Sequence, residues 1–361
     1  MKNTNNDYSQ ILNLGSLHEE IAKEQERKKG RTLPIIMMII ISIYGVIDGF
    51  FVSNYVGKSA FSSLNLVMPF IMILGGMGFM IGTGGSALVS KTLGQKENEK
   101  ANKIFSMMIV FTTILGLILS IIGIIFIRPV SYLLGASDEM IDNCVLYGRI
   151  VTSFTALFML QNVFQSFLAT AEKPKIGLIV TIAAGTTNAV LDYLFVAVFN
   201  FGLAGAAVAT GIGQVVGGLI PLIYFILPND SLLKLVKTKL SIKELLAACA
   251  NGSSELMSNV SSSIVGMVYN LQLMKYIGED GVATYGVLMY VQFVFVAIFI
   301  GYSIGTAPIV GYNYGATNYD ELKNVRKKSI AIMFTTGITL SIIAQLLAGT
   351  LAKIFVGYDQ N

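Results

Sequence analysis

Three acidic side chains lie inside long apolar segments of this sequence, where carboxylates are rare. They are Asp48, Asp192 and Glu255. A charged group at the centre of a lipid bilayer costs about 3 kcal/mol or more, so an acid in such a position is a candidate functional residue. The alternative is a structural role, either as a hydrogen-bonding partner between helices or as an acid that reaches the membrane surface.

Polar residues accompany two of these acids. Asn188 precedes Asp192 by four residues, so the amide and the carboxylate share one face of a helix. Their oxygens, together with the hydroxyl of Thr210, could coordinate a hard cation such as Na⁺. A desolvated carboxylate beside a second acid could instead hold a proton, because desolvation and like charge both favour its neutral form. The residues alone leave the choice of ion open.

The composition indicates that these acids belong to a polytopic membrane protein. The chain has 361 residues, of which 54% are hydrophobic and 13% are charged, against about 25% charged residues in a typical soluble domain. The apolar runs are continuous rather than alternating, which favours helices over the strands of a membrane barrel. We therefore predict an all-α fold with nine spans, each long enough to cross a bilayer. The predicted spans cover residues 32–54, 63–90, 104–127, 143–170, 176–199, 204–227, 246–274, 281–311 and 329–352.

The distribution of Lys and Arg predicts how the chain is oriented. Twenty of these 25 residues fall in the leader and in every second connection, whereas four fall in the other connections and Arg149 lies within a span. Because cytoplasmic loops carry the excess of positive charge, we expect a plasma-membrane protein with a cytoplasmic N-terminus. We interpret the basic clusters as topological anchors and expect no nucleic-acid partner.

An internal repeat divides the chain. A shift of 221 residues aligns four pairs of glycines without a gap. Because six spans separate the two copies, we expect parallel halves related by an axis along the membrane normal. A complete second half would run about 88 residues further, so we expect a truncated sequence that lacks three helices. The predicted units are a cytoplasmic leader (1–31), a first lobe (32–228), a cytoplasmic loop with the start of the seventh helix (229–250) and a partial second lobe (251–361).

Several kinds of catalytic site are excluded by the residues that the chain contains. His18 is the single histidine, and Cys144 and Cys249 are the two cysteines, which argues against His-based triads, disulfide frameworks and Cys-rich metal centres. An intramembrane aspartyl dyad is one alternative for the two acids, but neither lies in a GxGD sequence. We therefore expect no enzymatic activity and no cofactor. The glycine-rich run at 82–86 lacks the end of a P-loop and is expected to pack helices closely.

Polar and methionine-rich helices are expected to line a substrate cavity. The span at 246–274 carries too many polar side chains to face lipid on all sides. Methionines gather in the span at 63–90, where they fill the core or suit a pocket for varied apolar ligands. The predicted cavity residues are Tyr44, Met68, Met72, Gln161, Tyr269, Gln272 and Tyr290.

Five stretches of the chain resemble the multidrug and toxic compound extrusion (MATE) transporters, close to their MepA-like branch. The resemblance covers residues 30–356. It implies the MATE-type fold of twelve helices in two lobes, of which nine helices are present here. It also implies export of cationic and amphipathic drugs in exchange for Na⁺ or H⁺. The stretches are SIYGVIDGFFVSNYVGKSA (42–60), GTGGSALVSKTLGQ (82–95), TNAVLDYLF (187–195), LAGAAVATGIGQ (203–214) and GYSIGTAPIVGYNYGA (301–316).

The resemblance also assigns roles to individual residues. The family's cation site in the first lobe falls on Asp48, Asn188, Asp192 and Thr210. Glu255 matches an acid that some members use in the second lobe, and we expect it to act in coupling or in substrate binding. We expect drug-like small molecules and the lipid bilayer as partners of a monomeric protein.

Two alternative functions stay open. One is a flippase for lipid-linked precursors, although its substrate phosphates would call for cationic residues within the spans, where Arg149 is the main one. The other is a non-functional fragment of an efflux pump.

Overall fold

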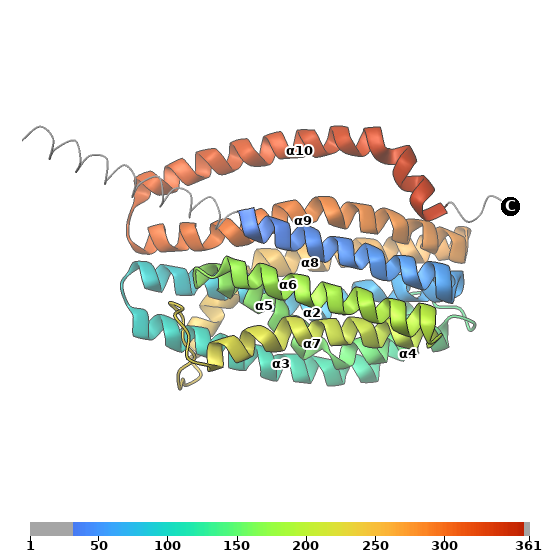
Figure 1. The fold of residues 1–361 in the computed structure, drawn as a ribbon, viewed down its shortest axis with the longest axis horizontal. Coiled ribbons are helices and arrows are strands. Elements are labelled where there is room, and N and C mark those ends of the chain that lie inside the picture. The colour runs from blue at the N-terminus through green and yellow to red at the C-terminus, as the bar shows by residue number, and fades with distance from the viewer. Residues whose placement is uncertain (1–31, 357–361) are drawn as a thin grey trace, which may run out of the picture.

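The computed structural model describes residues 32–356, and these form a bundle of long helices (Figure 1). No strand occurs among the described residues. The predicted leader at 1–31 lies outside them. The all-α prediction is confirmed. A helix satisfies the backbone hydrogen bonds of an apolar segment within that segment, which is what a lipid environment requires.

Each predicted span corresponds to one helix or to a pair of helices. The helices are an N-terminal helix (Thr32–Val56, ending in a π-helical turn at Val52–Val56), α2 (Lys58–Gly94), α3 (Asn98–Leu133), α4 (Ile141–Ser153), α5 (Thr155–Thr170), α6 (Pro174–Asp192, continued by a π-helical turn at Tyr193–Val198), α7 (Gly202–Ile226), α8 (Ile242–Tyr276), α9 (Glu279–Gly315) and α10 (Tyr319–Val356).

Length and composition support membrane crossing for most of these helices. Six described helices are long and apolar enough, and α4 with α5 makes a seventh if the pair is one span bent by 53°. The predicted fourth span is therefore broken near Phe154 rather than continuous. The helix α8 is long enough to cross a membrane but is not counted among these helices, because the many polar residues in its first half make it less apolar.

One face of α3 is suited to lipid. Its apolar side chains are about half exposed at positions three or four residues apart, which places them in a single stripe along the helix. A stripe of this kind would be unfavourable in water and is normal against hydrocarbon chains. The stripe comprises Ile114, Leu117, Ile118, Ile121 and Ile125.

The helices α2 and α9, which are copies of each other in the internal repeat, run alongside each other. Their contacts come in equivalent pairs, in which each residue lies 221 positions from its counterpart in the other helix. Gly286 lies against Asn65, and Gly311 lies against Ser90, and each of these pairs is separated by 221 positions. The backbone contact of Gly94 with Tyr312 is the counterpart of the contact of Gly315 with Lys91. The two helices thus meet at equivalent positions near both of their ends. In contrast, α10 lies at the edge of the bundle beside α9 (Figure 1).

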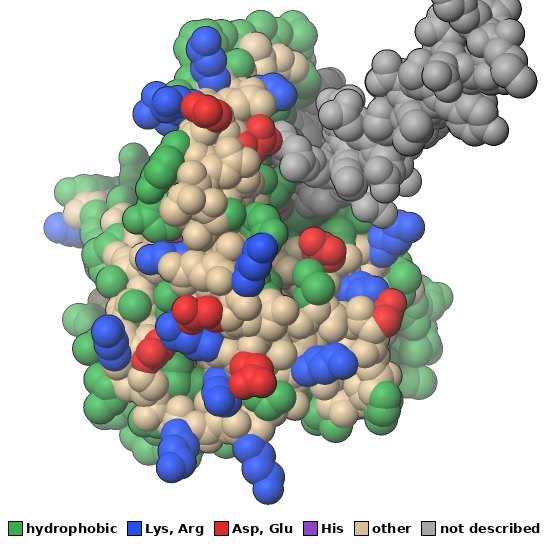
Figure 2. Space-filling model, turned by 90° about the vertical axis from the view of Figure 1, so that its left-hand side faces the viewer, with side chains coloured by type: hydrophobic (Ala, Val, Ile, Leu, Met, Phe, Trp, Pro, Cys, Tyr) green, Lys and Arg blue, Asp and Glu red, His purple; other side chains and the backbone are tan. Residues whose placement is uncertain are grey.

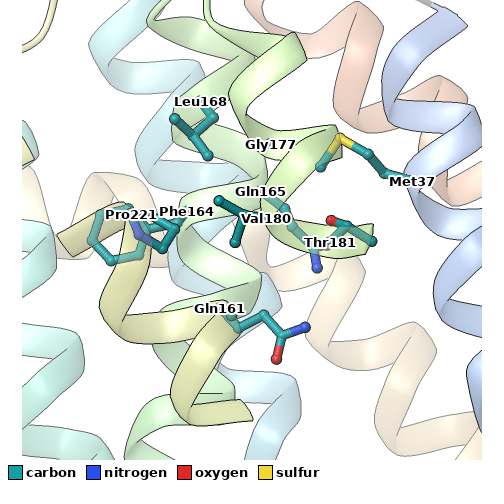
Figure 3. A pocket seen from close by; sticks show the side chains of 10 residues that line it. Met37, Gln161, Phe164, Gln165, Leu168, Gly177, Val180, Thr181 and Pro221 are labelled. Carbon is teal, nitrogen blue, oxygen red and sulfur yellow. The ribbon is translucent and has the colours of Figure 1, made fainter. Parts of the chain in front are cut away.

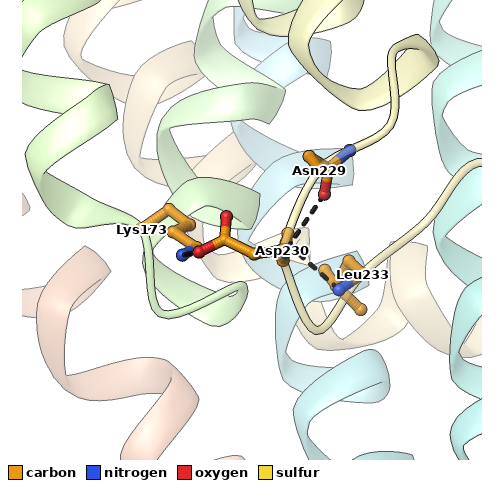
Figure 4. A network of polar contacts seen from close by, with 5 residues as sticks. Lys173, Asn229, Asp230 and Leu233 are labelled. Carbon is orange, nitrogen blue, oxygen red and sulfur yellow. Dashed lines mark hydrogen bonds and ion pairs between the residues drawn. The ribbon is translucent and has the colours of Figure 1, made fainter.

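A segment without regular secondary structure, residues 227–241, connects α7 to α8. Asp230 in this segment forms an ion pair with Lys173 at the start of α6, with 2.8 Å between Oδ2 and Nζ (Figure 4). The backbone N–H of Ser231 donates to Asn229 Oδ1 at 3.0 Å, and the N–H of Leu233 donates to Ser231 Oγ at 3.2 Å. These bonds fix the turn by which the chain leaves α7.

Candidate functional site

Each of the two central acids adjoins a π-helical turn. Asp48 lies one turn before the turn at Val52–Val56, and Asp192 is the last residue of α6, directly before the turn at Tyr193–Val198. A π-helical turn inserts one extra residue, shifts the phase of the helix and often marks a functional position. The sequence predicted the acids but not these turns, because no proline or other breaker marks them within the apolar runs.

The structure brings together the four residues predicted as a cation site. Asp192 is fully buried and Asp48 is 5% exposed, while Asn188 and Thr210 are half-buried. The side chain of Asp48 faces Thr210 on α7, and that of Asp192 faces Asn188 one turn earlier on α6. The carboxylates of Asp48 and Asp192 are close enough to repel each other. The cluster thus joins the N-terminal helix, α6 and α7.

These four side chains carry buried polar atoms that have no hydrogen-bond partner in the described structure. Leaving such an atom unsatisfied costs about 1–3 kcal/mol, and more when the group is charged. A bound cation or a proton removes this cost for the oxygens, whereas the amide nitrogen needs an acceptor such as ordered water. The atoms are Asp48 Oδ1, Asn188 Nδ2, both carboxylate oxygens of Asp192 and Thr210 Oγ1.

The donor set suits a hard monovalent cation better than a transition metal. The described residues contain no group of three or more His, Cys, Asp and Glu side chains that could hold a metal ion. A cation between Asp48 and Asp192 would take its other protein ligands from amide and hydroxyl oxygens, the pattern that hard ions prefer. The same pair of close carboxylates also suits a shared proton.

Close helix packing holds this cluster in place. Gly213 on α7 lies against Asn188, where an added Cβ would come within 3.1 Å of Asn188 Cβ. Gly185 on α6 makes room for the ring of Tyr44 from the N-terminal helix. The hydroxyl of Tyr44 donates to the Ile182 carbonyl oxygen at 3.4 Å. Tyr44, predicted to line the substrate cavity, therefore packs on α6, one turn from the acid cluster.

A small cavity of about 10 Å³, mainly apolar but with three polar side chains in its lining, lies among the N-terminal helix, α5, α6 and α7 (Figure 3). Gln161, another predicted cavity residue, lines it together with Gln165 and Thr181. Gln165 is 6% exposed, and its Oε1 has no described partner. Pro221 has no N–H, so the carbonyl of Gly217 in the preceding turn is left free at the same cavity. The volume and the polar groups fit one water molecule.

Two glutamines with buried side-chain oxygens in this region were not predicted from the sequence. Gln165 lies four residues after Gln161 on α5, and Gln214 lies four residues after Thr210 on α7. The Oε1 of Gln214 is also buried without a described partner. The sequence does contain a signal for both glutamines, because each is a polar side chain in an apolar span and lies one helical turn after a predicted site residue.

The other predicted residues lie away from the acid cluster. Glu255 is half-buried on α8, in the turn whose Leu256 and Asn259 contact Gly76 of α2. Tyr269 stacks on Tyr285 with 5.2 Å between ring centroids.

No described pocket gathers the predicted substrate-cavity residues into one site. Met68 and Met72 are half-buried on α2, and Gln272 is exposed on α8. The side chain of Tyr290 lies outside the described residues. The assignment of these residues to one substrate cavity stays a prediction.

Comparisons with known proteins identify relatives over most of the chain. The family model MatE matches residues 34–194 and 256–360. Multidrug export protein MepA of Staphylococcus haemolyticus is 29% identical over 322 residues, which cover 87% of this chain and 70% of the relative. Multidrug export protein MepA of Staphylococcus aureus (strain N315) is 27% identical over 329 residues, which cover 90% and 71%.

Solved structures share the fold. An outward-facing multidrug resistance MATE family transporter superposes with a TM-score of 0.80 at 23% identity, over 91% of this chain and 74% of that one. A MOP superfamily transporter from Pyrococcus furiosus superposes with a TM-score of 0.83 at 22% identity, over 92% and 75%. These findings confirm the resemblance and the fold, and the chain belongs to the MatE family of multidrug and toxic compound extrusion transporters.

Proposed function

We propose that this protein exports drug-like molecules, lipophilic cations among them, across the plasma membrane in exchange for Na⁺ or H⁺. The observation that carries the proposal is the buried pair of Asp48 and Asp192, in which Asp48 Oδ1 and both carboxylate oxygens of Asp192 lack hydrogen-bond partners in the described structure. The names of the MepA relatives, which are multidrug export proteins, support the same activity.

The acid pair provides a physical means of coupling. Two carboxylates that repel each other favour a state in which an ion or a proton lies between them. Binding would draw together the N-terminal helix, α6 and α7, which carry Asp48, Asp192 and Thr210. Release would let these helices separate again. Because a ligand shifts an equilibrium only through its different affinities for two states, the ion drives export if the drug prefers the state that the ion disfavours.

We also propose that the end of the bundle with the α2–α3 and α9–α10 turns faces the cytoplasm. Figure 2 shows this end, where Lys and Arg side chains lie around the rim. Positive charge in short connections keeps them on the cytoplasmic side, and the N-terminal helix begins at this end. The exposed basic residues lie in the α2–α3, α5–α6, α7–α8 and α9–α10 connections and in the first turns of the helices that follow them. They are Lys96, Lys100, Lys103, Lys175, Lys234, Lys237, Lys239, Lys243, Lys323, Arg326, Lys327 and Lys328.

Efflux of ethidium from cells that express the protein tests the proposal. We expect Asp48→Asn and Asp192→Asn to abolish energy-dependent efflux, because an amide keeps the shape of the side chain but cannot pair with a cation or take up a proton. The matched control is Asp142→Asn, which removes an acid that is exposed on α4. Efflux at the wild-type rate in both cluster variants, at equal expression, would refute the role of the acid pair.

A further inference from the structure

A larger pocket of about 540 Å³ lies at the basic end of the bundle, away from the acid cluster. The first two turns of α3 form one wall, and the segment that leads into α8 forms the other. Each wall contributes two lysines, Lys100 and Lys103 from α3 and Lys237 and Lys239 from the segment. The pocket therefore gathers four cationic side chains from parts of the chain that are more than 130 residues apart.

The pocket is built by specific hydrogen bonds between its walls. Three bonds of 2.8–3.0 Å attach the segment to α3, and they hold the backbone that carries the lysines. The lysines thus stay near one another without an ion between them. The bonds run from Lys234 N to Asn102 Oδ1, from Val236 N to Ser106 Oγ, and from Thr238 Oγ1 to the carbonyl oxygen of Lys103.

The charge balance of the pocket favours an anion. Glu244 is the single acid in the lining, and its carboxylate already accepts the hydroxyl of Ser241. Beside the pocket, Glu97 pairs with Lys100, with 2.9 Å between Oε2 and Nζ, so the positive charge of the lining rests mainly on Lys103, Lys237 and Lys239. The pocket also lies beside the N-termini of two long helices, since Lys100 is in the first turn of α3 and Ser241 directly precedes α8. Helix N-termini present free N–H groups and a positive dipole end, which favour negative charge.

The depth of the pocket indicates what kind of anion fits. Its remaining lining includes the buried apolar residues Ile104 and Met107. Both residues lie at the start of the long apolar part of α3, directly after its charged first turns. A ligand that suits the site carries a phosphate at the surface and apolar chains below it, which describes a phospholipid.

We propose that this pocket binds the phosphodiester headgroup of an anionic phospholipid. The lysines and the helix N-termini contact the phosphate, and the acyl chains extend along α3 toward its exposed apolar stripe. A bound lipid would bridge α3 and the segment between the two predicted lobes. The site is independent of the acid cluster, so it would bind lipid whether or not the protein exports drugs.

Native mass spectrometry of the purified protein tests this site, with phosphatidylglycerol as the probe and phosphatidylcholine as the neutral comparison. The double variant Lys103→Gln/Lys237→Gln removes one charge from each wall. Because each lysine near an anionic surface contributes about a fivefold gain in affinity, we expect phosphatidylglycerol binding to weaken about 30-fold. Lys327→Gln/Lys328→Gln on α10 removes the same charge elsewhere and should bind as the wild type does. Lys103→Arg/Lys237→Arg should retain binding, which separates loss of charge from loss of folding.

The outcomes distinguish the sources of the phosphate. Retention of phosphatidylglycerol in the presence of excess inorganic phosphate supports a lipid site. Binding of inorganic phosphate without retention of lipid would overturn it. Equal loss of phosphatidylglycerol in the pocket variant and the α10 variant would show only attraction by net charge, and would also overturn the proposal.

Discussion

The substitution Gly84→Ala tests how tightly α2 and α8 pack against each other. A Cβ at position 84 would come within 2.6 Å of the backbone nitrogen of Gly252 and would overlap the carbonyl oxygen of Ala248. Backbone atoms cannot rotate out of the way, so the two helices must part by roughly 1 Å to restore normal contact. Gly84 belongs to the run that the sequence predicted to pack helices closely, and the structure confirms this packing.

Two effects bear on the expected magnitude. Overpacking a close contact costs about 1–3 kcal/mol. Alanine in place of glycine favours the helix by about 1 kcal/mol. The helix preference is the same whether or not α2 and α8 touch, so it stabilises the fold without offsetting the contact. The closed contact is therefore expected to lose about 1–3 kcal/mol, which raises the population of a separated state about 5- to 160-fold.

The native cysteines supply the assay. Cys249 follows Ala248 on α8, is half-buried and packs against a core cluster that includes Met80 of α2, whereas Cys144 is fully buried. Separation of the helices would expose Cys249, so we expect its maleimide labelling to speed up about 5- to 160-fold in Gly84→Ala. Labelling of Cys144 should stay slow.

Gly337→Ala on α10 is the matched control, because a Cβ there meets nothing within 4 Å. Its labelling rate should equal that of the wild type. If Gly84→Ala labels Cys249 no faster than Gly337→Ala and melts at the same temperature, then α2 and α8 are not tightly packed at this position, and the reasoning fails.

Three further predictions concern other contacts. Gly185→Ala, whose Cβ would overlap the ring of Tyr44, should lower the free energy of unfolding by about 1–3 kcal/mol, and an unchanged thermal midpoint would contradict the packing of Tyr44 on α6. Lys173 holds the pKa of Asp230 below its ordinary value of 3.8. The ion pair therefore stabilises the folded turn at pH values above 3.8, and this stabilisation is lost as the pH falls through the lower pKa that Asp230 has in the folded protein. The protection factors of the Ser231 and Leu233 amides, which are corrected for the intrinsic slowing of exchange at low pH, should accordingly fall on acidification and in Asp230→Asn. Protection factors that stay the same under both changes would show that the pair does not fix the turn. Asp142→Asn breaks an ion pair with Arg128 whose side chains are 85% and 51% exposed, so the free energy of unfolding should change by less than about 1 kcal/mol, and a larger loss would mean that the pair is not screened by solvent.

The helical bundle was predictable because continuous apolar runs allow few other structures in a membrane. The helix limits were less accessible. For example, α3 begins at Asn98 rather than at residue 104, because its charged first turn continues the helix beyond the apolar run. The break at Phe154 has no proline or glycine beside it, so it reflects tertiary packing that a local pattern does not contain.

The acid cluster was predictable in part. The spacing of Asn188 and Asp192 placed them on one face of a helix without further information. That Asp48 and Thr210 join them depends on how three helices pack, and the resemblance to a known family supplied this step. Gln165 and Gln214 were missed because an isolated polar residue in a span does not show whether its side chain is satisfied.

The central claim is that a cation and a drug compete through the pair of Asp48 and Asp192. Its most direct test is the fluorescence of ethidium bound to purified protein, titrated with Na⁺ at fixed pH and with acid at fixed Na⁺. We predict that one of these ions releases bound ethidium from the wild type and that Asp48→Asn loses this release while it still binds the dye. Release that is equal in the wild type and in Asp48→Asn would contradict the account.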